Sequence, residues 1–181
     1  MLNTFPIARH PMGKSMGFTL IEVMVVVAII IILITLGLPS YRAWVQNTQI
    51  YNATESALGG LQKAKAEAVK RNVNVQFVLG ANPPWLIQLP ASAVIETSTT
   101  EGAKNVTATA TPTGTTTVTF SNLGGIATNA DGSVSLTQID FNSAVLTGSR
   151  NLRVTIGING VGSNIRMCDP NLATGSNPRA C

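Results

Sequence analysis

Charged residues make up only 11% of the 181 residues, and aromatic residues only 5%. The single histidine, His10, and the two cysteines, Cys168 and Cys181, leave few of the side chains that hold a metal ion. The aspartates and glutamates are few and scattered, so no pattern of paired acid and base groups indicates an enzyme. The sequence therefore predicts no catalytic centre, no cofactor and no metal site.

The net charge is also small. The formal value of +4 counts Arg9 and Lys14, which precede a long apolar segment. Without these two, ten basic residues stand against eight acidic ones, out of twelve and eight in the whole chain. A balance this even does not indicate a nucleic-acid-binding protein, so any contact with DNA must be local.

Residues 18–38 form the one long apolar run, and its only charge is Glu22. About 20 such residues cross a bilayer as a helix, and the basic residues ahead of the run favour a cytoplasmic N-terminus. A carboxylate in hydrocarbon costs about 2.5–3.5 kcal/mol, so Glu22 needs a reason to be there. A secretory signal has a shorter core followed by a small-x-small cleavage site, which is missing here. A plain membrane anchor explains the length but neither Glu22 nor Gly17-Phe18.

The segment KSMGFTLIEVMVVVAIIIILITLGLP resembles the type III signal of type IV pilins and type II secretion pseudopilins. The resemblance implies that residues 1–17 are a prepilin leader, which a membrane peptidase cuts after Gly17. It implies methylation of the new N-terminal residue, Phe18. It also implies that Glu22 pairs with the N-terminal amine of a neighbouring subunit or of its own chain, which would set the register of assembly. An unpaired carboxylate among apolar helices must otherwise neutralise.

The helical pattern continues beyond the membrane segment, over residues 39–71. Pro39 is expected to kink or locally melt the helix, and the pair Gly59-Gly60 to weaken it. Apolar residues recur at steps of three and four as far as about Arg71, which predicts one stripe packed on the rest of the chain. The stripe comprises Tyr41, Trp44, Val45, Ile50, Ala53, Ala57, Leu58, Leu61, Ala64, Ala68 and Val69.

Residues 72–181 have the pattern of a β-rich domain with six or so mainly antiparallel strands. A first hairpin is predicted around the turn at 81–84, and a last one around Asn159-Gly160. Residues 91–114 are expected to be loops with one weak strand around Val106. The predicted strands are 73–79, 85–89, 116–120, 138–141, 152–158 and 161–167. Cys168 and Cys181 are expected to form a disulfide that closes a short terminal loop, which implies an oxidising compartment.

The ending CDPNLATGSNPRAC resembles the minor pilins of the FimU and FimT group, which share a domain with the type II secretion pseudopilin GspH. The resemblance implies a pilin-like α+β fold, in which a long N-terminal helix packs on a C-terminal antiparallel β-sheet domain. It implies a minor pilin in the complex that primes pilus assembly. The implied partners are other minor and major pilins, the prepilin peptidase and the inner-membrane assembly platform. The implied location is the bacterial inner membrane, with the domain in the periplasm, and then the pilus.

Two other functions stay open. FimT-like pilins bind DNA through a Gly-Arg-x-Arg motif, of which Ser163-Asn164-Ile165-Arg166 retains only the second arginine. Arg166 could join a small basic patch, whose other members are Arg150, Arg153 and Arg179. We favour the alternative that Arg166 and Arg179 satisfy carbonyls of the terminal loop or pair with Asp169. The other open function is that of a GspH-like pseudopilin in type II secretion.

Overall fold

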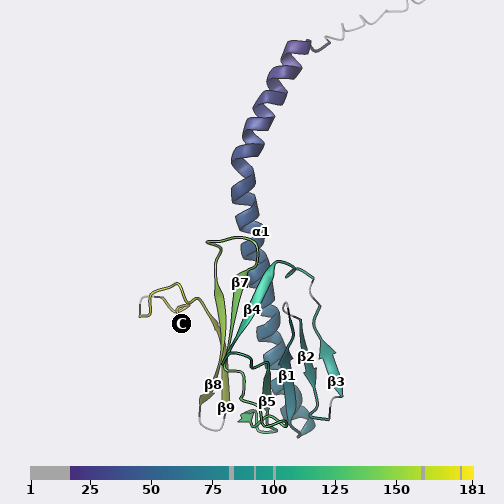
Figure 1. Cartoon of the computed structure of the whole chain (residues 1–181), viewed down its shortest axis with the longest axis vertical. Helices are drawn as coiled ribbons and strands as arrows, with labels where there is room; N and C mark the ends of the chain where they lie inside the picture. The colour runs from purple at the N-terminus through teal and green to yellow at the C-terminus, as the bar shows by residue number, and fades with distance from the viewer. Residues whose placement is uncertain (1–16, 82–83, 92, 100, 160–161, 176) are drawn as a thin grey trace, which may run out of the picture. The chain divides into compact units, whose positions relative to one another are not determined.

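The structure is a computed structural model that describes residues 17–81, 84–91, 93–99, 101–159, 162–175 and 177–181 (Figure 1). The chain forms two compact units, one ending at Pro39 and the other comprising Ser40–Cys181. One helix, α1 (Leu20–Arg71), runs through both, and the strands all belong to the second unit. Each unit is described by itself.

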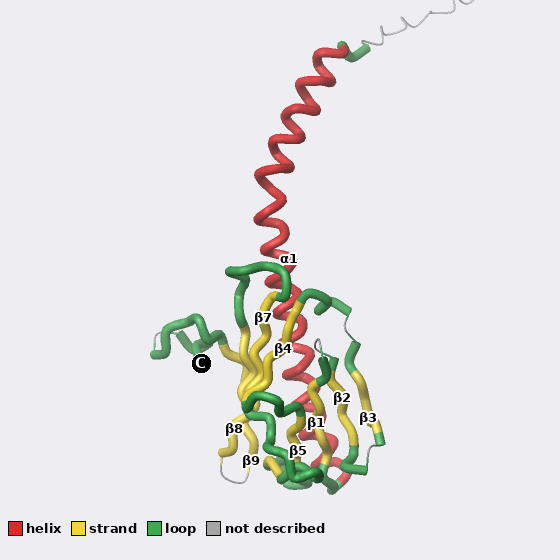
Figure 2. Tube along the Cα trace, viewed as in Figure 1, coloured by secondary structure: helices red, strands yellow, loops and turns green. Residues whose placement is uncertain are grey.

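The strands of the second unit form two antiparallel sheets (Figure 2). The first sheet has the order β3-β2-β1-β5-β6 and the second the order β4-β7-β8-β9. The first comprises β1 (Val75–Leu79), β2 (Trp85–Gln88), β3 (Val94–Thr97), β5 (Thr117–Phe120) and β6 (Ile126–Ala127). The second comprises β4 (Val106–Thr111), β7 (Gln138–Ser143), β8 (Leu152–Asn159) and β9 (Gly162–Cys168). The predicted α+β, pilin-like class is confirmed, with two sheets where one was expected.

The part of α1 that belongs to the second unit packs its apolar stripe into one core with both sheets. Its buried apolar residues recur every three or four positions and are at most 4% exposed: Ile50, Ala53, Ala57, Leu61, Ala64 and Ala68. Phe77 and Phe120 of the first sheet and Phe141 of the second complete this core. The predicted stripe is therefore confirmed from Ile50 to Ala68. It is wrong for Tyr41, Trp44 and Val69, whose side chains are exposed.

The helix ends where the sequence predicted, through a specific backbone device. Asn72 adopts a left-handed conformation with φ 54°. Its N–H donates to the carbonyl of Val69, and the N–H of Val73 donates to the carbonyl of Ala68, both at 3.3 Å. These two bonds form a Schellman motif, which satisfies the last helical carbonyls and turns the chain into β1.

The strand predictions were right for the two hairpins and incomplete between them. β1 pairs with β2 and β8 with β9, as expected. Residues 82–83 and 160–161 of the two turns lie outside the described residues. Residues 91–114 were predicted as loops with one weak strand, but they contain β3 and the six-residue β4. β4 pairs with β7 along its whole length. The short strand β6 was not predicted.

Small side chains explain the missed length of β4. Its inward positions, Val106, Ala108 and Ala110, alternate with threonines and pack against or within the core. Alanine contributes little apolar area per residue, so the alternation gives a weak hydrophobic signal although the strand is fully paired. β3 was missed because it is an edge strand whose four residues are all at least partly exposed.

Candidate functional site

The N-terminal end of α1 carries three residues that the sequence singled out, Gly17, Phe18 and Glu22, and all three are exposed. The hydroxyl of Thr19 accepts a hydrogen bond from the backbone N–H of Glu22, at 3.3 Å, and so caps the helix. Glu22 is the acidic residue of the first turn, where a negative charge complements the helix dipole. The spacing Thr19-x-x-Glu22 is that of a capping box, which is a sequence signal for a helix start.

Every described residue from Gly17 to Pro39 is exposed in this unit. The helix is long and apolar enough to cross a membrane, with a mean hydropathy of 3.0 over its most apolar window. Phe18 and Glu22 line a shallow hollow of about 260 Å³ on the helix surface, together with Val23, Val26 and Val27. The unit therefore presents a continuous apolar surface that a membrane or other helices must cover.

The helix conformation continues through Pro39. Proline removes one backbone hydrogen bond from the helix, yet no break in α1 occurs at this position. The local melting that the sequence suggested is therefore not present in this structure. A kink at Pro39 stays a prediction.

The C-terminal loop is closed as predicted, by the disulfide between Cys168 and Cys181, whose Cα atoms are 5.1 Å apart. Asp169, only 5% exposed, organises the loop from inside. Its carboxylate accepts a hydrogen bond from the N–H of Asn171, at 3.0 Å, and pairs with the guanidinium of Arg150, at 2.9 Å. Its backbone bonds to Arg179 and Cys181. The loop beside β9 can be followed to the labelled C-terminus in Figure 2.

The four arginines of the predicted basic patch have different environments. Arg150 pairs with Asp169, and Arg153 pairs with Asp140 at 2.6 Å. Arg166 donates to the carbonyl oxygens of Ala180 and Cys181, at 3.4 and 3.2 Å. Arg166 therefore binds carbonyls of the terminal loop, the first of the two arrangements that we favoured. The carboxylate of Asp169 pairs with Arg150 and not with Arg166 or Arg179.

Arg179 is the exception within the described part of the chain, because its guanidinium has no hydrogen bond or ion pair there. It lines a hollow of about 160 Å³ together with Tyr51, Arg150 and Met167. The neighbouring carboxylate of Glu55 raises the pKa of Tyr51 through a hydrogen bond and its charge, and the charge of Arg179 opposes this. Arg150 and Arg153 are thus ion-paired, whereas Arg166 and Arg179 have no carboxylate partner among the described residues.

Comparison with known proteins identifies the family. The model of the family described as type II transport protein GspH matches residues 53–160, more than half of the chain. The prokaryotic N-terminal methylation motif matches residues 13–38, a range that includes Gly17, Phe18 and Glu22. The chain belongs to the GspH family. No curated protein sequence matches it.

Two crystal structures of the type IV minor pilin FimU from Pseudomonas aeruginosa are similar to this GspH-family chain. One has 19% sequence identity and a TM-score of 0.46, and covers 70% of this chain and 98% of its own. The other has the same identity and a TM-score of 0.43, and covers 62% of this chain and 89% of its own. At these values the likeness carries no further conclusion.

Sequence reasoning missed two features of this GspH-family chain that bear on its contacts. One is the role of Asp169, which was named only as a possible partner of Arg166 or Arg179 and in fact holds the terminal loop; the signal was the Cys-Asp-Pro sequence next to a candidate disulfide. The other is Val145, which is 67% exposed in the loop between β7 and β8. No sequence signal marks Val145, because one valine in a polar segment is ordinary.

Proposed function

We propose that this GspH-family chain is a minor type IV pilin, a structural subunit of the priming or tip complex that initiates pilus assembly. The observation that carries the proposal is the exposed apolar surface of residues 17–39 with a single carboxylate, Glu22, near its start. Such a surface is stable only inside a bilayer or among other apolar helices. A pilin subunit that moves from the bilayer into a bundle of apolar helices keeps this surface covered in both places.

Maturation follows from the same segment. We propose cleavage after Gly17 and methylation of Phe18, which leaves a positively charged amine four residues from Glu22. Before assembly the subunit would span the inner membrane, with Ser40–Cys181 in the periplasm. In the filament, the Glu22 carboxylate would pair with the amine of a neighbouring subunit. Other minor and major pilins, the prepilin peptidase and the assembly platform are the proposed partners.

The two alternative functions have different support. The family description and the shared N-terminal signal are compatible with a type II secretion pseudopilin. The disulfide-closed ending, which resembles that of FimU-like pilins, favours the pilus. For DNA capture, the ion pairs of Arg150 and Arg153 leave Arg166 and Arg179 as the two arginines whose charge no carboxylate offsets, and two phosphate contacts give only weak, salt-sensitive binding. Because the guanidinium of Arg179 has no partner among the described residues, it is the arginine best placed to bind a phosphate.

The test is a gene deletion complemented with wild-type and variant chains, with surface pili, type II secretion and DNA uptake measured in parallel. Glu22→Ala removes the proposed assembly contact. Glu101→Ala is the matched control, because it removes another exposed carboxylate outside the apolar segment. Arg179→Ala serves the DNA assay better than a change at Arg166, which would also loosen the terminal loop.

We expect the deletion strain to lose its pili and to keep normal secretion. The Glu101→Ala chain should restore the pili, and the Glu22→Ala chain should not. Normal pili with defective secretion would replace the proposal by the pseudopilin. Normal pili and secretion, with DNA uptake that falls on Arg179→Ala, would replace it by the DNA receptor.

A further inference from the structure

A cluster of exposed apolar side chains lies on the second unit. Tyr41 and Trp44 of α1 are 61% and 65% exposed, and their ring centroids are 6.2 Å apart. Val145, in the loop between β7 and β8, is 67% exposed. A hollow of about 340 Å³ joins the helix to this loop, and its walls include Tyr41, Val145 and Leu146. We call these four residues the aromatic–loop patch.

The loop that presents Val145 is held in place by hydrogen bonds. The hydroxyl of Ser143 accepts from the N–H groups of Val145 and Leu146, at 3.1 and 2.8 Å. The carbonyl of Asn105 accepts from the N–H of Ala144, at 2.9 Å, and from the side-chain amide of Gln46, at 2.8 Å. The exposed valine is therefore fixed next to the helix.

The loop is also tied to the helix a second time. The N–H of Arg150, at the far end of the loop, donates to the side chain of Asn47 at 2.9 Å. Tyr41, Asn47 and Val145 thus belong to one local structure. An ordered apolar patch of this kind, exposed without a partner in the described residues, indicates a contact surface.

The position of the patch along the chain indicates what covers it. Tyr41 and Trp44 follow the apolar run, which ends at Leu38, by three and six residues. At 1.5 Å per residue, this places Tyr41 about 4.5 Å beyond the hydrocarbon, inside the headgroup layer of about 5–8 Å, and Trp44 about 9 Å beyond it, at the outer edge of that layer. Tyrosine and tryptophan are enriched in this layer. Arg42, between them, also suits it because lipid headgroups carry phosphate.

We propose that the aromatic–loop patch rests on the interfacial layer of the bilayer that the chain's own apolar segment crosses. The contact of Val145 and Leu146 is the new element, because these residues lie about a hundred positions after the span. The patch would fix the orientation of the domain on the membrane before the subunit is extracted. The inference rests on the membrane insertion that the proposed function includes.

The experiment uses the full chain reconstituted into phosphatidylcholine and phosphatidylglycerol vesicles that contain brominated lipid, a quencher of tryptophan fluorescence. A Trp44→Phe background leaves only Trp85, which is buried and whose emission also reports that the domain is folded. Val145→Trp then places a reporter in the patch. Val134→Trp is the matched control, since Val134 is 64% exposed and lies three residues from Asp131.

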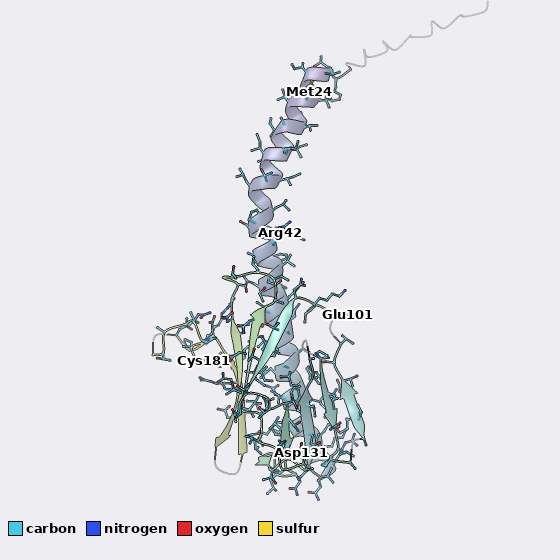
Figure 3. All side chains as sticks on the ribbon, in the orientation of Figure 1. Met24, Arg42, Glu101, Asp131 and Cys181 are labelled. Carbon is cyan, nitrogen blue, oxygen red and sulfur yellow. A yellow bond between two sulfur atoms is a disulfide. The ribbon has the colours of Figure 1, made fainter. Side chains whose placement is uncertain are left out.

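Figure 3 labels Arg42, which follows Tyr41 of the patch in sequence, and Asp131, which lies three residues before the control position Val134. The two labelled residues lie at opposite ends of the unit that comprises Ser40–Cys181. We expect brominated lipid to quench most of the emission that Val145→Trp adds. Bromines close to the lipid headgroup should quench it more than bromines close to the end of the acyl chain. Emission added by Val134→Trp should be unchanged. In the unmodified background, the emission of Trp44 itself should be quenched like that of Val145→Trp.

Leu33→Trp, within the apolar segment, checks insertion. Quenching at Leu33→Trp without quenching at Val145→Trp overturns the inference and leaves the proposed function intact. Equal quenching at Val145→Trp and Val134→Trp also overturns it, because the domain then has no preferred face. An unquenched Leu33→Trp overturns both the inference and the membrane step of the proposed function.

Discussion

Replacing Gly60 by alanine measures how tightly α1 packs on the first sheet. Gly59 and Gly60 are adjacent in the helix, but only Gly60 is buried. A Cβ atom added at Gly60 would lie 2.7 Å from Cε2 of Trp85, and within 2.9 Å of two further indole atoms. A Cβ atom added at Gly59 would have no atom within 4 Å outside its own helix turn. Comparing Gly59→Ala with Gly60→Ala therefore separates the effect of helix propensity on stability from the effect of packing.

The indole of Trp85 has little room to move away. It stacks on Phe77 with ring centroids 5.8 Å apart, and its Nε1–H donates to the hydroxyl of Ser56 at 3.0 Å. The backbone N–H of Trp85 is bonded to Ser98 at 2.7 Å. An alanine at position 60 must therefore displace either the helix or a side chain that a ring contact and a hydrogen bond hold in place.

The two substitutions should have different effects on the free energy of unfolding. Alanine in a helix interior is more favourable than glycine by about 0.8–1.0 kcal/mol, which Gly59→Ala should gain. Gly60→Ala gains the same amount but adds overpacking, which costs about 1–3 kcal/mol. The propensity cancels between the variants, so Gly60→Ala should be less stable than Gly59→Ala by about 1–3 kcal/mol. For a unit of this size, that is a difference in Tm of about 3–5 °C per kcal/mol.

The assay is thermal unfolding of the full chain in detergent, followed by tryptophan emission and near-ultraviolet circular dichroism. Equal stability of the two variants would refute the packing argument, because the close approach to Trp85 would then cost nothing. A double-mutant cycle with Trp85→Phe adds a second check. In that background the penalty of Gly60→Ala should shrink, since the smaller ring leaves space for the methyl group.

Three further predictions concern the polar groups of the domain. Asp169→Ala should lower stability by about 1–3 kcal/mol because it removes buried charged hydrogen bonds. Asp140→Ala removes a more exposed carboxylate and should lower stability less; chemical denaturation measures both. The side chain and N–H of Ser133 hold the pKa of Asp131 below its ordinary value, so Ser133→Ala should raise that pKa toward it, as a carboxyl titration by nuclear magnetic resonance would show. Because a lowered pKa stabilises the folded state above the unfolded pKa, the stability difference between wild type and Ser133→Ala should shrink as the pH falls through the folded pKa. Reduction of the disulfide, worth about 3 kcal/mol in the loop-entropy model, should speed hydrogen exchange in the terminal loop without unfolding the domain; collapse of the core on reduction would contradict this.

The helix could be predicted from the sequence almost to its last residue. Its apolar period, the change of period after Arg71 and the presence of Asn72 all favour an end at this point, and the Schellman motif provides the mechanism. The middle of the β domain could not be predicted as well. Strands such as β4 turn partly buried alanines to the core on one face and threonines outward on the other, and this pattern hardly differs from that of a polar loop.

The candidate site shows a similar division. The N-terminal signal depends on local spacing, so Gly17, Phe18 and Glu22 could be singled out from the sequence alone. The environment of each arginine depends on contacts between distant segments, as in the pairing of Arg150 with Asp169, and spacing does not reveal it. Periodicity likewise could not distinguish apolar residues that face the domain's own core from Tyr41 and Trp44, which do not.

Most charged side chains in this chain have partners within the domain, whereas many apolar side chains are left uncovered, and this difference bears on function. Within the described residues, most of the charged side chains of the unit Ser40–Cys181 have partners inside that unit, as Arg153 has in Asp140 and Lys65 in the carbonyl of Ser163. The apolar side chains of residues 18–38, and those of Tyr41 and Trp44, have none of comparable extent. A protein that recognises a small charged ligand would be expected to show the reverse, with unpaired charges converging on a closed pocket. Charged groups that are bonded within the domain, together with uncovered apolar surface, are instead typical of a subunit whose contacts are membrane lipid and other helices. Substitutions on that apolar surface should therefore affect the proposed assembly most.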